Sequence, residues 1–146
     1  MLRRPVRRTR SGRYQLHLSG VERDLLRSLP GQLKELLGTD DPSLKRLFPP
    51  AYPDDPALEA EYHALVRDDL VTSRAAALDV MAATVDAPDL DEEQLTGWLS
   101  ALNDIRLVLG TQLDVSEDDI GGDTPQYELY RYLTYLQEMV VEALAG

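Results

Sequence analysis

The sequence predicts a mainly α-helical protein, a bundle of about five to six helices preceded by a small N-terminal β-hairpin. Apolar residues recur at three- and four-residue steps along much of the chain, the spacing that lines one face of a helix. Capping-box and proline signals mark the helix starts, and apolar and polar residues alternate at residues 14–18. A chain of 146 residues fits one domain. We therefore expect a single domain at residues 1–146, with a basic arm and hairpin at 1–18 and a helical body at 19–146.

The β-hairpin is expected within the first 18 residues. Residues 6–9 would form its first strand, residues 10–13 the turn and residues 14–18 the second strand, whose tyrosine and leucines alternate with polar residues. Two strands alone are marginally stable in water. The hairpin is therefore expected to lie on the helices.

The first helix is predicted to begin after Ser19, because Ser19 and Glu22 have the spacing of a capping box. Pro30 removes a backbone donor within the following apolar stripe, so we expect either a kink or two short helices. Gly38 is expected to end this region, and residues 41–47 to add one short helical turn. The apolar stripe consists of Val21, Leu25, Leu26, Leu29, Leu33, Leu36 and Leu37.

A proline-rich segment follows at residues 48–55, where three prolines within five positions exclude a regular helix or a central strand. Residues 49–52 match the Pro-Pro-x-Tyr ligand of WW domains, which bind polyproline II segments. Because four residues are a weak signal, we favour a rigid connector whose Phe48 and Tyr52 rings pack against the body. Tyr52 is also a candidate interface residue.

The second helical region is predicted to begin with Asp55 as N-cap and Pro56 at the first helical position. The stretch 67–74 is polar enough that one long helix and two joined helices are both compatible with the sequence. The apolar face consists of Leu58, Tyr62, Leu65 and Val66, and later of Leu78, Met81 and Val85.

The most strongly specified helix is predicted at residues 91–110. Asp91 and Gln94 have the spacing of a capping box, and acidic residues in the first turn suit the positive end of the helix dipole. Trp98, the only tryptophan, belongs to the apolar stripe of this helix. We therefore place this helix at the centre of the core.

The last helix is predicted to begin at a threonine-proline pair, after an acidic stretch at residues 114–123 that we expect to be an exposed loop. Tyr132, Tyr135 and Met139 widen its apolar stripe beyond one packed face. Such width fits either deep burial or contact with a partner subunit, including a homodimer. These three residues are therefore candidate interface residues. The stripe itself consists of Tyr127, Tyr130, Leu133, Leu136, Val140 and Leu144.

Signatures of catalysis and of metal or cofactor binding are missing from the sequence. There is no cysteine, which excludes disulfides, thiolate catalysis and cysteine-based metal sites within these residues. No phosphate-binding glycine loop or nucleophile elbow occurs. His63 would share a helix face with Glu59 and Arg67, an arrangement more typical of a solvated ion-pair face than of a metal site. We therefore predict no catalytic residue, no metal and no cofactor.

The acidic stretch 114–123 suggests two further hypotheses. Its first, third and fifth residues match the ligand spacing of a calcium-binding EF-hand loop, but Asp119 stands in place of the required glycine and Pro125 in place of the glutamate. A hydrolase that uses the loop carboxylates is the enzyme alternative. A plain solvated loop is the simpler interpretation.

Basic residues are concentrated at the N-terminus. Six of the 15 lysines and arginines lie in the first 13 positions, which contain no acid, so the remaining chain has a formal charge of −17. Arginines bind phosphates or acidic surfaces through paired hydrogen bonds. Neutralising the protein's own acidic body, or protecting the edge of the hairpin, explains them equally well. The candidate partner-binding or phosphate-binding residues are Arg3, Arg4, Arg7, Arg8, Arg10 and Arg13.

The sequence contains no targeting or membrane-spanning pattern. The basic N-terminus is not followed by an apolar run of signal-peptide length, and no stretch is long and apolar enough to span a membrane. We therefore expect a soluble, cytoplasmic protein that does not bind membranes.

Four sequence runs together resemble a known family, and the resemblance covers nearly the whole chain. They are Arg-Thr-Arg-Ser-Gly-Arg-Tyr-Gln-Leu (8–16), Glu-Arg-Asp-Leu-Leu-Arg-Ser-Leu-Pro (22–30), Leu-Phe-Pro-Pro-Ala-Tyr-Pro-Asp-Asp-Pro (47–56) and Leu-Asn-Asp-Ile-Arg-Leu-Val-Leu-Gly-Thr (102–111). They are similar to a small actinobacterial domain family of unknown function, often encoded beside the ClpS protease adaptor and sulfur-assimilation genes. One branch is described as an oxidative-stress transcriptional regulator that works with an alternative sigma factor and senses oxidants through cysteines. The resemblance implies a regulatory role, but no cysteine here could carry a disulfide switch.

We therefore predict a non-enzymatic regulatory or protein-interaction protein, linked to transcription or to the stress response. It would act through a protein partner, such as a sigma factor or another transcription component. The missing catalytic groups support this prediction from the residues, whereas the regulatory role is implied by the resemblance. The alternative is a direct DNA-binding regulator that uses the arginine arm, and its binding should weaken steeply with salt.

Overall fold

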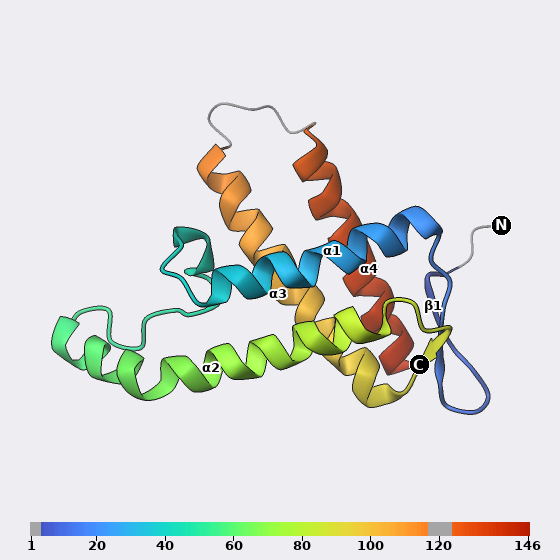
Figure 1. The fold of residues 1–146 in the computed structure, drawn as a ribbon, viewed down its shortest axis with the longest axis horizontal. Helices are drawn as coiled ribbons and strands as arrows, with labels where there is room; N and C mark the ends of the chain where they lie inside the picture. The colour runs from blue at the N-terminus through green and yellow to red at the C-terminus, as the bar shows by residue number, and fades with distance from the viewer. Residues whose placement is uncertain (1–3, 117–123) are drawn as a thin grey trace.

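The computed structural model of the protein describes residues 4–116 and 124–146, and for residues 114–116 it describes the backbone only. Within these ranges it contains four α-helices, one 3-10 helix and three short strands (Figure 1). The fold is mainly α-helical with an N-terminal hairpin, as predicted, but the expected five to six helices were too many. In chain order the elements are β1 (Val6–Arg8), β2 (Tyr14–Leu16), α1 (Gly20–Leu37), η1 (Pro42–Leu44), α2 (Pro56–Thr84), β3 (Asp89–Leu90), α3 (Glu92–Ser116) and α4 (Pro125–Ala145).

The helix count was overestimated because neither of the two places where the sequence allowed a helix to be divided separates two helices. Pro30 lies inside α1, which continues through it, and its ring is buried. Its missing N–H therefore does not divide the helix in two. The polar stretch 67–74 likewise lies inside one long α2, which settles the alternative that the sequence left open. The short turn expected at residues 41–47 is present as η1.

Helix α3 occupies the centre of the core, as predicted, and packs against α1, α2 and α4. Asp91 and Gln94 make both hydrogen bonds of the capping box, at 2.7 and 2.9 Å. Trp98 is completely buried, and its indole N–H donates to the Thr84 hydroxyl at 2.7 Å. The helix continues to Ser116, so the loop expected from residue 114 begins later than predicted. Residues 117–123 of that loop lie outside the described part of the chain.

The N-terminal hairpin belongs to a three-stranded antiparallel sheet in the order β1-β2-β3. Tyr14 of β2 pairs with Arg8 on one side and with Leu90 on the other, so β3, which was not predicted, covers the second edge of β2. Gly12 has φ +83° in the turn, a conformation that residues with a side chain rarely adopt. Tyr14 and Leu16 are buried, and therefore the sheet lies on the helices as expected.

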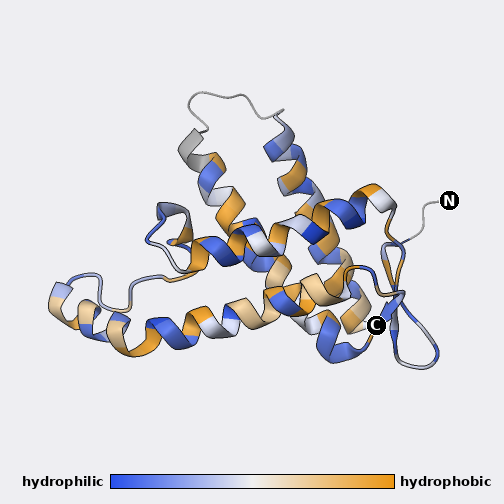
Figure 2. Ribbon diagram, in the orientation of Figure 1, coloured by the Kyte–Doolittle hydropathy of each residue, from blue (hydrophilic) through white to orange (hydrophobic). Residues whose placement is uncertain are grey.

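Helix α2 has buried residues only near its C-terminal end. Its fully buried residues, Leu78, Met81 and Thr84, all belong to the last turns, whereas the N-terminal part projects beyond the other helices at the left of Figure 1. Gly97 allows α3 to cross close to this packed end, because a Cβ there would lie 3.0 Å from Val80. Figure 2 shows that apolar residues nevertheless continue along the projecting part of α2.

Helix α4 begins as the sequence predicts and packs antiparallel to α3 (Figure 1). The Thr124 hydroxyl accepts a hydrogen bond from the Tyr127 N–H, and Pro125 occupies the first helical position. Leu133, Leu136 and Val140 carry its buried face. None of the helices in the described ranges has the length and apolarity needed to cross a membrane.

Candidate interaction surfaces

The N-terminal arginines that the structure describes lie on and beside the β-hairpin, and three of them contact the protein itself. Arg4 lies 3.3 Å from the carboxylate of Glu142 on α4, and Arg13 lies 2.6 Å from that of Asp89. Arg7 donates to the side chain of Gln15, the residue opposite it on β2, at 3.2 Å. Part of the arm therefore neutralises the acidic body, as one of the two interpretations of the sequence predicted.

Two arginines of the arm remain available for other contacts. Arg8 and Arg10 are exposed, and neither side chain makes a hydrogen bond or ion pair with the part of the chain that the structure describes. Arg8 lies on β1, one of the two edge strands of the sheet, and Arg10 lies in the turn that follows it. Arg3 lies outside the described residues.

Tyr132 of α4 is engaged within the protein. Its hydroxyl donates to the Glu22 carboxylate at 2.7 Å, and Glu22 also accepts from the Ser19 N–H in the capping box of α1. Burial, followed by the hydrogen bond to Glu22, raises the pKa of Tyr132 far above its ordinary value. This candidate interface residue thus joins α4 to the start of α1.

The other candidate interface residues of α4 are more accessible. Tyr135 is 46% exposed and Met139 is half-buried. Val141, one and a half helical turns beyond Tyr135, is also exposed, at 47%. A hollow of about 350 Å³ lies beside Val141 and reaches Arg106 of α3. Two of the polar atoms at this hollow, Arg106 Nε and Gln137 Oε1, are buried without a hydrogen-bond partner among the described residues.

The proline-rich connector packs on α2 through an aromatic cluster. Phe48 is buried, and the guanidinium carbons of Arg67 and Arg74 lie 4.2 and 5.6 Å from the centre of its ring. Tyr52 makes an edge-to-face contact with Tyr62 at 6.2 Å and remains 44% exposed. The predicted connector is therefore present, with the Phe48 ring packed fully and the Tyr52 ring only in part.

Arg74 also forms a buried ion pair that the sequence analysis missed. Its guanidinium lies 2.7 Å from the Asp104 carboxylate of α3 and donates to the Leu47 carbonyl at 3.0 Å. Burial raises the pKa of Asp104, and the hydrogen bond from Arg74 opposes that rise. The sequence feature that could have indicated this pair is Asp104 itself, because an acidic residue between the apolar positions Leu102 and Ile105 is unusual in a core helix.

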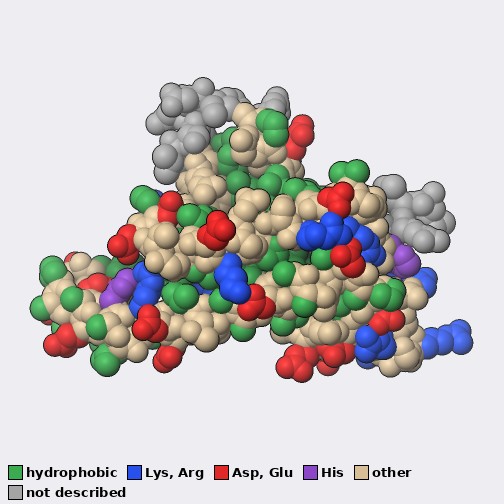
Figure 3. All heavy atoms as spheres, viewed as in Figure 1, with side chains coloured by type: hydrophobic (Ala, Val, Ile, Leu, Met, Phe, Trp, Pro, Cys, Tyr) green, Lys and Arg blue, Asp and Glu red, His purple; other side chains and the backbone are tan. Residues whose placement is uncertain are grey.

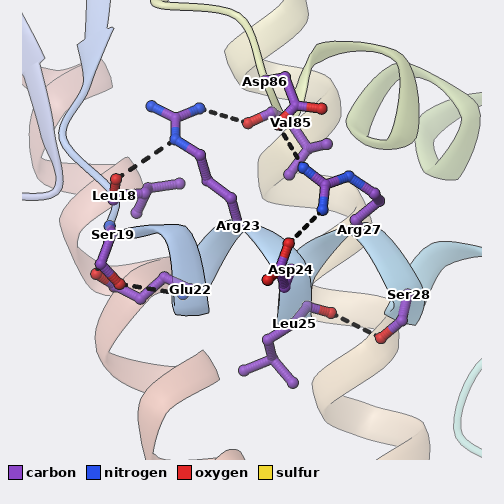
Figure 4. Close-up of polar contacts among 10 residues, drawn as sticks. All are labelled: Leu18, Ser19, Glu22, Arg23, Asp24, Leu25, Arg27, Ser28, Val85 and Asp86. Carbon is purple, nitrogen blue, oxygen red and sulfur yellow. Dashed lines mark hydrogen bonds and ion pairs between the residues drawn. The ribbon is translucent and has the colours of Figure 1, made fainter.

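A second polar network ties α1 to the end of α2 (Figure 4). Arg23 donates to the carbonyls of Leu18, at 3.4 Å, and Val85, at 2.5 Å. Arg27 bridges Asp24 and Asp86, both at 2.5 Å. These arginines join segments about sixty residues apart, so they act within the fold rather than at a reactive site.

The described side chains form no constellation for metal-dependent chemistry. Among the described side chains, those of residues 4–113 and 124–146, no group of three histidines, aspartates or glutamates could bind a metal ion. His63 lies 4.0 Å from Glu59, the pair that its spacing predicted, but the Glu59 side chain is less solvated than expected, at 21% exposed. The EF-hand and hydrolase hypotheses depend on the acidic stretch 114–123, whose side chains lie outside the described residues.

The described residues form a helical body with a small sheet, and apolar and charged side chains lie on its surface. The chain belongs to the family described as Domain of unknown function (DUF2017), which matches residues 3–144. Proteins named Oxidative stress regulator AosR, from Mycobacterium tuberculosis and Mycobacterium bovis, are 28% identical over 188 aligned residues, covering 94% of this chain and 85% of theirs. A Mycobacterium leprae protein that also carries the AosR name is 31% identical over 128 residues, covering 72% of this chain and 59% of its own. No solved structure matches the chain. The resemblance inferred from the sequence is thus confirmed.

Proposed function

We propose that this protein is a non-enzymatic regulator of the stress response that acts by binding another protein in the cytoplasm. The observation that carries the proposal is the similarity to proteins named oxidative stress regulators, which extends over 94% of the chain. A sigma factor or another component of the transcription machinery is the partner class that we propose. Self-association to a homodimer is compatible with the same role.

The described surface supports a binding role more than a catalytic one. Tyr135 and Val141 expose apolar area on α4, and Val141 lines the 350 Å³ hollow; exposed apolar patches commonly mark protein contacts. The titratable groups whose pKa shifts most, such as Tyr132, are held in contacts within the fold. Because the chain has no cysteine, we propose that its regulation does not use a disulfide within these residues.

The proposal is tested by replacing the exposed apolar residues of α4 in the source organism. A Tyr135→Glu, Val141→Glu double variant should lose co-purification of the transcription component that wild-type protein retains, and should lose the transcriptional response to oxidant. Val21→Glu is the matched control, because Val21 is 80% exposed on α1 and should be replaceable without effect. An oxidant response that survives deletion of the whole gene would contradict the regulatory role.

Direct DNA binding through the arginine arm is the second candidate, favoured by the free side chains of Arg8 and Arg10. Arginine contacts to phosphates release counterions, so DNA affinity would fall steeply with salt. An Arg8→Gln, Arg10→Gln variant should then lose most of the affinity in a mobility-shift titration. Arg13→Gln is the control, because Arg13 already pairs with Asp89. Salt-independent binding, or binding that the double variant retains, would exclude this candidate.

A further inference from the structure

The projecting part of α2 has an apolar stripe that no other part of the described chain covers. None of residues 56–77 is fully buried. Leu58 and Leu65 are 42% and 79% exposed. They stand seven residues apart, two helical turns, so both side chains lie on the same face about 10 Å from each other. An exposed leucine by itself is ordinary, but two aligned on a helix that projects from the body form a continuous stripe.

The opposite face of the same helix segment is occupied by the protein. Arg67 stacks on Phe48 and donates to the Thr39 carbonyl at 3.1 Å, and Glu59 accepts from the Tyr52 N–H at 2.8 Å. Each of these residues is turned away from Leu65 by 3.6-residue helix geometry. The connector therefore packs on the side of the helix turned away from Leu65, and the leucine stripe faces solvent.

Acidic side chains flank the stripe. Glu61, Asp68 and Asp69 are exposed and lie within about 60° of Leu65 around the helix axis. Residues 54–69 carry six acidic residues and one arginine, and that arginine is engaged with Phe48. Figure 3 shows hydrophobic and acidic side chains intermingled on the visible face of this end of the molecule.

We propose that this surface, Leu58, Leu65 and the flanking acids Glu61, Asp68 and Asp69, is a docking site for a basic amphipathic helix of a partner protein. An amphipathic helix would place apolar residues on the two leucines and lysines or arginines on the acids. A second copy of this chain fits less well. Antiparallel pairing of two α2 helices about Leu65 would set Glu61 against Asp69 of the other copy, and like charges repel.

The inference rests on the proposed function only in taking the partner to be a protein, and its test needs no transcriptional readout. The probe is a fluorescent synthetic peptide of about 20 residues, roughly 30 Å of helix, with leucines at helical spacing and lysines between them. Two further peptides are needed, one of the same composition in scrambled order and one with glutamate in place of lysine. Each is titrated with the full chain by fluorescence anisotropy.

The wild-type chain should bind the basic amphipathic peptide more tightly than the scrambled one and should not bind the acidic one. A Leu58→Gln, Leu65→Gln variant should weaken binding by at least about tenfold, as for residues at the centre of an interface. A Glu61→Gln, Asp68→Asn, Asp69→Asn variant should weaken it and reduce its salt dependence. Val21→Gln is the control for a lost exposed apolar residue, and circular dichroism checks that each variant is folded.

Three results would overturn the proposal. Equal binding of the scrambled and ordered peptides would mean simple charge attraction, and unchanged binding by the leucine variant would place the contact elsewhere. The third result would be failure of the peptide to bind, together with a dimer that sedimentation equilibrium detects in the wild-type chain and not in the leucine variant. The stripe would then be a self-association surface. Peptide binding by the wild-type chain, together with an oxidant response that survives deletion of the whole gene, would instead contradict only the proposed function.

Discussion

At the scale of single residues, Trp98 is the side chain on which the core depends most. Its ring is completely buried and its N–H has one partner, the Thr84 hydroxyl. Trp98→Ala should lower the free energy of unfolding by about 3–5 kcal/mol, because it removes a large buried ring. Thr84→Val should cost about 1–3 kcal/mol by leaving the indole N–H without an acceptor. Urea denaturation of both variants measures these losses, and a near-zero effect of Trp98→Ala would remove α3 from the centre of the fold.

The buried pair of Arg74 and Asp104 makes a second prediction at this scale. Removing Arg74 leaves the Asp104 carboxylate, whose side chain is only 3% exposed, without its cation, so Arg74→Met should destabilise the protein by about 3–5 kcal/mol. An Arg74→Met, Asp104→Leu double variant removes both charges and should recover much of that loss. Chemical denaturation of the single and double variants tests this. A double variant less stable than either single variant would show that the pair itself stabilises the fold.

Glu22 makes a prediction about pH. Burial alone would raise the pKa of Glu22, but hydrogen bonds from Ser19 and Tyr132 outweigh it and hold the pKa below the usual 4.5. At a pH between the lowered pKa of the folded protein and the usual value of about 4.5, the unfolded chain therefore binds more protons at Glu22 than the folded protein does. The stability that Glu22 contributes is lost as pH falls below about 4.5. Wild type should be more stable than Glu22→Gln at neutral pH, and the difference should shrink on acidification. Thermal denaturation across pH measures it, and a difference that grows in acid would contradict the assignment.

At the scale of elements, the crossing of α2 and α3 depends on the small size of Gly97. A methyl group there would lie 3.0 Å from Val80 Cγ1 and 3.3 Å from Val80 Cβ. Gly97→Ala should therefore destabilise the protein, because overpacking costs about 1–3 kcal/mol, more than the roughly 1 kcal/mol gained in helix propensity. Val80→Ala makes room, so adding Gly97→Ala to that background should be neutral or stabilising. A Gly97→Ala variant as stable as wild type would mean that the helices separate without cost.

The starts of the helices were predicted correctly where the capping signal lies within a few neighbouring residues. The capping boxes at Ser19 and Asp91 and the cap at Thr124 formed as predicted, since each needs residues only three positions apart. Of the two outcomes expected at Pro30, two short helices did not form, because a buried position on α1 stabilises a helix through a proline that would interrupt it in isolation. Tertiary packing overrides propensity at such a position.

At the scale of the whole molecule, strand β1 is part of the folded body and not a free arm. Its Val6 is buried, and Arg4 beside it reaches Glu142 of α4. Deleting residues 1–13 should therefore lower the melting temperature by roughly 3–12 °C. The loss of one buried valine costs about 1.5–3 kcal/mol, and each kcal/mol shifts melting by about 2–4 °C at this chain length. Arg8→Gln, Arg10→Gln, which leaves the strand intact, should melt like wild type. Calorimetry on both proteins makes the comparison.

The candidate surfaces were only partly predictable. Charge counting identified the arginine arm, and helical spacing identified the α4 residues, but neither indicated that Arg4 and Tyr132 contact the protein itself. The projecting leucines were assigned to an apolar face without any sign that part of it stays uncovered. Whether a face is covered depends on the lengths and directions of neighbouring helices, which periodicity does not encode.

The sequence alone determined the helical class, the caps, the hairpin and the burial of Trp98, because these depend on residues a few positions apart and on apolar periodicity. Only the tertiary structure decided that β3 completes the sheet, that Arg74 finds Asp104, and that Arg23 binds the carbonyl that follows α2. The physical reason is the same for all three. A buried strand edge, acid or arginine must find a partner, but its partner lies tens of residues away and is selected by how the helices pack.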